Sequence, residues 1–355
     1  MRIGLIARAD NTGLGVQTWE FYRHMQPDKI LVIDVGHLHN YTDHCNKKTF
    51  RDRYPNAMYY RDWTPTTQLL TTFLRGLDVV FTAETPYSME LFSLAREMGV
   101  RTVLQYNFEF LPHIRHQPAA PKPDVFAAPS MWRWDEVPFD NKVFLPVPIA
   151  SDRFEYANRR LQADKSHTRH FLHIVGRPCV FDRNGTPDVL GALRHVKSDI
   201  RLTIKCQDTS YLRQTRNSAH VPPNVELIID HSDVPNYWDN YSDGDVMILP
   251  RRYGGLCLPA NEALGAGMPV IMTDIEPNNV WLPPEWLVPA TKVSEFMVMN
   301  MIDVYHADHV ALAAKIDQFA SDDSFYAAAA ERAGVLAKEL SWDNLRPEYE
   351  RVLSA

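Results

Sequence analysis

The chain has 355 residues, of which 45% are hydrophobic, and it carries a formal net charge of −7 at pH 7. This length predicts two domains of about 150 to 200 residues each, and the charge excludes a protein that binds nucleic acid through overall basicity. No apolar run reaches the roughly 18 residues that span a bilayer, and Met1 leads directly into an apolar run without a cationic leader. We therefore expect a cytoplasmic protein. The four cysteines include no C-x-x-C pair, which indicates neither a disulfide framework nor a zinc site.

Short apolar runs alternate with helical patterns through the first 150 residues. The apolar runs are typical of strands that are buried on both faces. Strands that alternate with helices form parallel sheets, so this half predicts a doubly wound α/β domain. We predict strands at 3–7, 30–35, 77–82, 101–105 and 124–129, and helices at 16–25 and 87–98.

A glycine-rich turn at residues 10–15 follows the first strand. Gly13 and Gly15 would let a ligand approach the backbone, although the same spacing is also typical of a tight turn. The G-x-G pattern lacks the third glycine of a dinucleotide-binding fingerprint, which argues against NAD.

Polar side chains follow two of the predicted strands in this half. Glu84 ends one strand, and Asn107 and Glu109 follow another. Ligands of such sheets bind beyond the carboxyl ends of the strands, so these side chains are candidates for a ligand site. Asn107 cannot act as a general base, which leaves Glu84, Glu109 or a group on the ligand itself as the proton acceptor. Either carboxylate could instead cap a helix or bind a loop.

A stiff connection leads into the second half. Pro146 and Pro148 favour an extended chain, and we place the domain boundary near residue 150. The second half again alternates strands with helices, and it ends in an alanine-rich stretch that we predict to be helical throughout. The predicted strands are 170–175, 202–205, 225–229 and 246–249, and the predicted helices are 187–195 and 293–340.

Residues 245–274 carry the most informative pattern. An all-apolar run, 246–249, is followed by Gly254 and Gly255, and a helical pattern that contains Glu262 begins at Pro259. A strand, a glycine turn and a helix start in this order form an anion site. The free N–H groups of residues 255–258 and the positive end of the helix would face the ligand.

This segment resembles the signature of retaining GT-B glycosyltransferases, E-G-F-G-L-P-x-x-E-A-x-A-x-G-x-P-V-I, over a long stretch without gaps. Glu262 matches the second glutamate of the signature, and the resemblance implies that it binds the nucleotide ribose. Gly254 stands where the first glutamate of the signature helps to hold the donor sugar. The resemblance implies a donor site made of Gly13, Gly15, Gly254, Gly255, Leu256, Cys257, Leu258 and Glu262.

A second motif agrees with this resemblance. Arg177 follows the strand at 170–175, in a segment similar to the family pattern G-R-x-x-x-K-G. The lysine position carries Asn184, so we assign the second cation of the pattern to Arg183. In the family these cations hold the donor diphosphate, whose charge rises as the glycosidic bond breaks. A surface position is the alternative for Arg183.

The resemblance implies two Rossmann-like doubly wound domains that face each other across a cleft. The N-terminal domain at 1–150 would bind the acceptor, 151–325 would bind the nucleotide sugar, and a C-terminal helix at 326–355 would pack back towards the N-terminal domain. The implied reaction moves a sugar from a nucleoside-diphosphate sugar to an acceptor hydroxyl with retention of configuration. Its catalytic residues would be Arg177, Arg183, Glu84 and Glu109.

Several alternatives stay open from the sequence. The acceptor could be a small molecule, a lipid, a glycan or a hydroxylated base in DNA, and the nucleotide, the sugar and the oligomeric state are not indicated. A GT-B sugar epimerase, or a nucleotide-sugar binding protein without turnover, would share the same pattern.

We expect neither a metal nor a bound cofactor. His37, His39 and His44 lie close together but have no carboxylate or cysteine at a supporting helical spacing. The D-x-D sequence at residues 243–245 stands before a strand and not after one, and arginines and a helix start would supply the positive charge instead.

Overall fold

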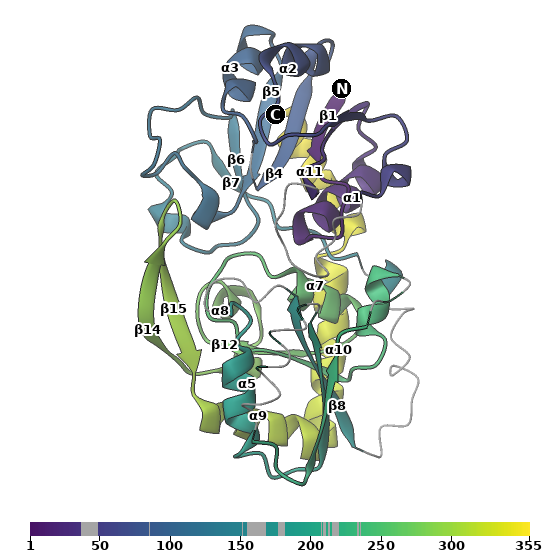
Figure 1. Ribbon diagram of the computed structural model, residues 1–355, viewed down its shortest axis with the longest axis vertical. Coiled ribbons are helices and arrows are strands. Elements are labelled where there is room, and N and C mark those ends of the chain that lie inside the picture. Colours follow the sequence, from purple (N-terminus) through teal and green to yellow (C-terminus); the bar gives the residue numbers. More distant parts are fainter. Residues whose placement is uncertain are drawn as a thin grey trace. The chain divides into compact units, whose positions relative to one another are not determined.

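The computed structural model describes residues 1–36, 49–84, 86–150, 152–154, 168–176, 182–206, 208, 211, 214, 220–232, 234 and 236–355. The chain forms two compact units (Figure 1). Unit 1 consists of Met1–Val147, Met297–Met301 and Trp342–Ala355, and unit 2 consists of Pro148–Phe296 and Ile302–Ser341. Each unit contains one parallel sheet with helices, which confirms the predicted fold class of two doubly wound α/β domains.

Unit 1 is built on a seven-stranded parallel sheet in the order β3-β2-β1-β4-β5-β6-β7. Its central strands are buried along nearly their whole length, as the apolar runs predict. The strands are β1 (Ile3–Ala7), β2 (Lys29–Ile33), β3 (Met58–Tyr60), β4 (Val79–Glu84), β5 (Arg101–Tyr106), β6 (Val125–Ala128) and β7 (Lys142–Phe144), and the helices are α1 (Gly13–Met25), α2 (Thr67–Leu74), α3 (Glu90–Glu97) and α11 (Trp342–Ser354).

Aromatic packing joins α1, β4 and α11 in the core of unit 1. Phe21 of α1 stacks on Phe81 of β4, with ring centroids 4.2 Å apart. Tyr349 of α11 lies 6.0 Å from Phe21, and its hydroxyl donates to the carbonyl of Pro146. The final helix, α11, is therefore part of this core, although it is far from α1 and β4 in sequence.

Unit 2 is built on a six-stranded parallel sheet in the order β10-β9-β8-β11-β12-β13, with a separate two-stranded sheet, β14-β15. The strands are β8 (Arg169–Gly176), β9 (Ile200–Cys206), β10 (Val225–Asp230), β11 (Val246–Leu249), β12 (Val270–Thr273), β13 (Leu287–Val288), β14 (Ala290–Met297) and β15 (Met301–Ala307). The helices are α5 (Thr186–Leu193), α7 (Leu258–Gly265), α8 (Asn278–Trp281), α9 (His309–Ser321) and α10 (Asp323–Glu339), with a 3₁₀ helix at Tyr237–Tyr241.

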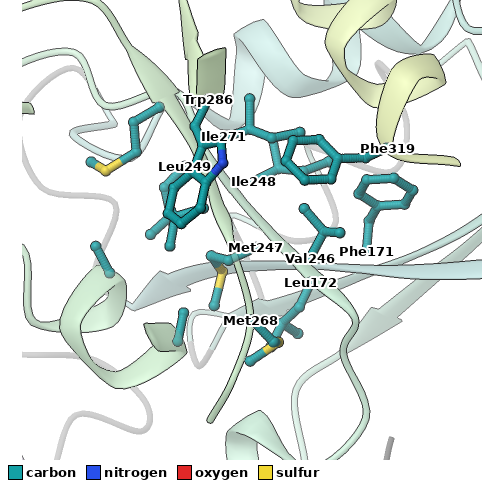
Figure 2. Close-up of a cluster of buried hydrophobic side chains, with 14 of the residues drawn as sticks. Phe171, Leu172, Val246, Met247, Ile248, Leu249, Met268, Ile271, Trp286 and Phe319 are labelled. Carbon is teal, nitrogen blue, oxygen red and sulfur yellow. The ribbon is translucent and has the colours of Figure 1, made fainter. Parts of the chain in front are cut away.

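The core of unit 2 surrounds β11. All four residues of this strand are buried, and their side chains lie among those of β8, β12 and the surrounding helices (Figure 2). Trp286 and Phe319 are among the largest fully buried side chains of the cluster. Burial on both faces explains why β11 reads as an unbroken apolar run and not as an alternating one.

Two parts of the secondary structure differ from the sequence prediction. The prediction of a helix through 293–340 is wrong over its first part, because β14 and β15 extend to Ala307 and the helices begin only at His309. Most side chains of β14 are exposed, so this strand is held by pairing with β15 and shows little burial pattern. The sequence reading also missed β3, β7 and α2 of unit 1 and β12, β13 and α8 of unit 2, all of them short elements.

In both sheets the strand order reverses at one point, where ligands of open α/β sheets bind. In unit 1 this switch point lies between β1 and β4, and in unit 2 it lies between β8 and β11. The two glycine-rich turns that the sequence singles out follow β1 and β11. Each unit therefore carries one of these turns at its own switch point.

Candidate functional site

The backbone N–H groups of the turn between β11 and α7 have no hydrogen-bond acceptor in the described part of the chain. Gly254 adopts φ +108°, a conformation that side chains rarely allow. None of the described residues accepts a hydrogen bond from the N–H groups of residues 254–258. The residue that precedes α7, Cys257, supplies no side-chain cap. This helix start therefore presents several unused donors, an arrangement that favours an anion, and the donor contacts predicted for residues 254–258 stay a prediction.

The loop before α5 lies directly against this turn. Gly185 has φ +77°, and a Cβ atom there would stand 2.2 Å from the carbonyl oxygen of Pro250. The N–H of Arg252 donates to the carbonyl of Arg183 over 2.9 Å. The guanidinium of Arg183 lies over the ring of Tyr253, 5.0 Å from its centroid. The structure thus places Arg183 against the two residues that directly precede the 254–258 turn, although the two segments are about 70 residues apart in sequence.

Two further positions of the predicted cation motif, Arg177 and Asn184, differ in whether the structure describes them. Arg177, which comes directly after the last residue of β8 in the sequence, lies outside the described residues. Asn184, at the lysine position of the family pattern, donates from its side-chain amide to the carbonyls of Ile174 and Val175 over 2.9 Å each. Asn184 therefore holds the end of β8 and, being uncharged, is not itself the second cation, so the assignment of that cation to Arg183 stays a prediction.

Glu262 is buried and already has tyrosine partners. Its carboxylate accepts a hydrogen bond from the hydroxyl of Tyr237 at 2.7 Å and another from Tyr241. Burial, and then the negative charge of Glu262, raise the pKa of both tyrosines well above the usual value. Both hydroxyls therefore stay protonated and donate to the carboxylate. The ribose contact of Glu262 stays a prediction, and the structure adds a second role that the sequence reading missed.

Two buried arginines that the sequence reading passed over follow β11. Arg251 and Arg252 are only 4% and 7% exposed. The guanidinium of Arg252 donates to the carbonyl of Tyr305 and to Nε2 of His306, both over 3.0 Å. Nδ1 of His306 in turn donates to the fully buried Asp188 over 2.6 Å. Paired arginines after a buried strand are a signal that could have drawn attention to these positions.

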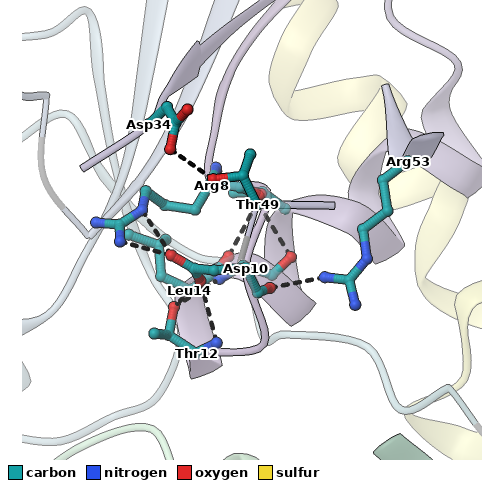
Figure 3. A network of polar contacts seen from close by, with 9 residues as sticks. Arg8, Asp10, Thr12, Leu14, Asp34, Thr49 and Arg53 are labelled. Atoms are coloured by element: carbon teal, nitrogen blue, oxygen red, sulfur yellow. Dashed lines mark hydrogen bonds and ion pairs between the residues drawn. The ribbon is translucent and has the colours of Figure 1, made fainter. Parts of the chain in front are cut away.

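The turn at the switch point of unit 1 is closed by its own side chains (Figure 3). The carboxylate of Asp10 pairs with Arg8 and accepts from the N–H of Thr12 over 3.0 Å. Arg53 donates to the backbone carbonyl of Asp10 over 2.6 Å. Thr12 caps α1 by accepting from the N–H of Gly15 over 3.2 Å. Two of the donors that an anion would use are therefore already satisfied within the turn.

The structure gives Gly15 a packing role. A Cβ atom on Gly15 would lie 2.2 Å from the carbonyl oxygen of Asp10, so no other residue fits there without movement. The predicted contact of Gly13 and Gly15 with a donor stays a prediction. The glycine at position 15 is required by the turn itself.

The predicted carboxylates of unit 1 lie at the ends of β4 and β5. The side-chain amide of Asn107 donates to Glu84 over 2.8 Å, so the structure brings these two predicted residues together. Glu84 has φ +59°, as does Tyr87 three positions later. Left-handed backbone at residues other than glycine is strained, and such strain clusters at functional sites. Glu109 lies in a 3₁₀ helix, Phe108–Phe110, and is 2% exposed.

The two aspartates of the D-x-D sequence at residues 243–245 make contacts within the fold of unit 2. The carboxylate of Asp245 accepts from the N–H of His170 over 2.9 Å, and the N–H of Asp245 donates to the carbonyl of His170. Asp243 lies 3.4 Å from the imidazole of the same histidine. These contacts join the starts of β8 and β11. Within the described ranges no group of three or more metal-binding side chains occurs, and the cluster at His37, His39 and His44 lies outside them.

Residues 169–319 match the family model described as "Glycosyl transferases group 1". The matched segment contains the described strands of the unit 2 sheet, the α5 loop and the 254–258 turn. No curated protein sequence matches the chain significantly.

Solved structures resemble the whole chain. They include HepE from Anabaena in complex with UDP, with 11% identity, a TM-score of 0.69 and coverage of 100% of both chains. A glycosyltransferase from Rickettsia africae has 12% identity and a TM-score of 0.68 over 99% of this chain and 97% of its own. Sucrose-phosphate synthase from Thermosynechococcus elongatus has 15% identity and a TM-score of 0.62 over 99% and 98%. The chain has the GT-B fold. Among the described residues of this GT-B chain, no helix is both long enough and apolar enough to cross a bilayer.

Proposed function

We propose that this GT-B protein is a glycosyltransferase that moves a sugar from a nucleoside-diphosphate sugar to an acceptor hydroxyl with retention of configuration. The observation that carries the proposal is the contact of the loop before α5, residues 182–185, with residues 250–253 at the switch point of unit 2. Arg183 lies there against Arg252 and Tyr253, which directly precede the unused N–H groups of the 254–258 turn. The family match over 169–319 supports it, and so do related folds solved with UDP and with UDP-glucose.

The chemistry that this arrangement supports is stabilisation of a leaving group. When the glycosidic bond breaks, negative charge builds up on the nucleoside diphosphate. The N–H groups of 254–258, the start of α7, Arg183 and Arg177 would bind the diphosphate more strongly as that charge grows. A phosphate oxygen can then take the proton of the incoming hydroxyl on the same face of the sugar. This route needs neither a protein nucleophile nor a divalent metal.

The first test is a thermal-shift screen of UDP, GDP, ADP, CDP and their common sugars, followed by calorimetry on each hit. We expect one nucleoside diphosphate to raise the melting temperature and to bind without added metal. No shift and no binding heat with any of these nucleotides would overturn the proposal.

The second test measures turnover of the bound donor without an acceptor. Slow hydrolysis to the unchanged sugar supports a transferase, release of an epimerised sugar supports a GT-B epimerase, and binding without turnover supports a non-catalytic binding protein. Activity should survive EDTA, and a loss that manganese restores would contradict the metal-free mechanism. NMR of the transferred or released sugar then reports whether the anomeric configuration is retained.

A further inference from the structure

Arg251 differs from its neighbour Arg252 in how its guanidinium is used. Arg252 donates to Tyr305 and His306, as described above. Arg251 is more deeply buried, at 4% exposed, and its Nε donates to the carbonyl of Tyr253 over 3.0 Å. No described acceptor lies within hydrogen-bond distance of its two terminal nitrogen atoms, and no described carboxylate forms an ion pair with it.

The free end of Arg251 lies against the ligand-facing turn. A Cβ atom built on Gly254 would stand 2.6 Å from the terminal nitrogen Nη2 of Arg251. The guanidinium therefore occupies the space into which a side chain at position 254 would project. In the resembling family this position carries a glutamate, so a positive group stands here in place of a negative one.

Packing alone does not explain a buried guanidinium with this few partners. A buried charge is costly unless it is paired or fully hydrogen-bonded. Another deeply buried arginine of unit 2, Arg169, pairs with Asp323 and stacks over the ring of Tyr326 at 4.0 Å. Arg251 has no such carboxylate among the described residues, although the planar guanidinium is shaped to bind two oxygen atoms of one anion.

We infer that Arg251 binds an oxyanion of the donor substrate beside Gly254. This inference rests on the proposed function and names the chemical class that the site takes. The oxyanion has two sources in a nucleotide sugar: the diphosphate, or a carboxylate on the transferred sugar, as in a hexuronic acid. Both would make charge-assisted hydrogen bonds with the terminal N–H groups of Arg251.

The test is calorimetry with inorganic pyrophosphate, UDP, UDP-glucose and UDP-glucuronic acid as probes, using the wild-type chain, Arg251→Gln and Arg251→Lys. If the anion is on the sugar, Arg251→Gln weakens UDP-glucuronic acid by at least about tenfold and leaves UDP and UDP-glucose unchanged. If it is the diphosphate, the substitution weakens all four probes by a similar factor. Either pattern supports the inference, and Arg251→Lys should recover part of the loss.

Unchanged affinity of Arg251→Gln for every probe that the wild type binds would overturn the inference and leave the proposed function standing. A wild-type chain that binds none of the four probes and none of the nucleotides of the thermal-shift screen would overturn both. The control is Arg201→Gln, which removes the same charge from a surface pair with Glu226 and should change no affinity. Thermal unfolding of each variant shows whether it is folded. If Arg251→Gln is not folded, the affinities of Arg251→Lys are compared with those of the wild type instead.

Discussion

The two sheets of this protein share their strand order around the switch point, although one has seven strands and the other six. Each places a glycine-rich turn and a helix start there, but the two turns differ in how many of their N–H groups have an acceptor. In unit 1 the side chain of Thr12 caps α1, and Asp10 accepts from the turn and neutralises Arg8. In unit 2, α7 begins after Cys257 without a side-chain cap, and no described residue accepts from residues 254–258.

This difference shows that glycine spacing alone does not identify a ligand site. The residues that decide are the polar ones around the glycines. Aspartate and threonine in the turn provide internal acceptors, which compete with a ligand for the same donors. A turn that has arginines and no acceptor side chains leaves its donors for an anion. The comparison therefore favours unit 2 as the place where the diphosphate binds.

The largest expected effect concerns the predicted cation that follows β8. Arg177→Ala should lower the turnover of donor hydrolysis by about a hundred- to a thousandfold, because a fixed cation beside the leaving group stabilises the transition state more than the bound donor. Arg177→Lys should lie in between, since it keeps the charge but loses the planar geometry. If kcat held and only the donor KM rose, Arg177 would be a uniform binding residue, and Arg183 or the 254–258 N–H groups would stabilise the leaving group.

Replacing Glu262 tests both of its roles. Glu262→Ala should weaken nucleoside-diphosphate binding by about ten- to a hundredfold through loss of a charged hydrogen bond to the ribose. It should also lower the free energy of unfolding by about 1 to 3 kcal/mol, because the buried hydroxyls of Tyr237 and Tyr241 lose their acceptor. Calorimetry and denaturant unfolding measure the two effects. Tyr237→Phe is the control for the second role, and unchanged nucleotide affinity in Glu262→Ala would remove Glu262 from the ribose site.

A smaller effect should separate the two turns directly. Thr12→Ala should cost about 1 kcal/mol of unfolding free energy through loss of the helix cap, without changing nucleotide affinity. Thr66→Ala removes a similar cap from α2 of the same unit, where Thr66 accepts from the N–H of Leu69 over 3.3 Å, and serves as the matched control. A drop in nucleotide affinity with Thr12→Ala alone would show that the unit 1 turn takes part in donor binding.

The smallest expected effect is a dependence of stability on pH in unit 2. Burial lowers the pKa of His173, whose Nδ1 donates to Ile248 and whose Nε2 accepts from Thr186. The folded state thus favours the neutral imidazole. Its contribution to stability is complete above the ordinary histidine pKa of about 6.5 and is lost as the pH falls below that value. Denaturant unfolding between pH 5 and 8 should show this slope, and His173→Gln should reduce it; an equal slope in the variant would assign the dependence to other groups.

The sequence predicted those features of the fold and of the candidate site whose residues lie close together along the chain. The β11 strand, the glycine turn and the α7 helix lie within 20 consecutive residues, and the sequence pattern alone predicted all three. The contacts of Glu262 with Tyr237 and Tyr241 join residues more than 20 positions apart, so no local pattern indicated them. Strand pairing, and not burial, makes β14 extended, which is why its residues were mistaken for a helix.

The roles of the paired arginines were not predictable from spacing either. Arg251 and Arg252 are adjacent in sequence, yet one is tied to β15 and the other lies against Gly254. Only the positions of β15 and of the turn distinguish them. The closed state of the unit 1 turn likewise depends on Arg53, which comes from a segment more than 40 positions away.

The most direct test of the account is backbone hydrogen exchange with and without saturating UDP, or with whichever nucleoside diphosphate gives the largest thermal shift. The account predicts that the nucleotide slows exchange of the N–H groups of residues 254–258, which have no acceptor in the described chain, and leaves those of Thr12 and Gly15 unchanged, because side chains already accept from them. Slowed exchange at 11–15 with no change at 254–258 would contradict it.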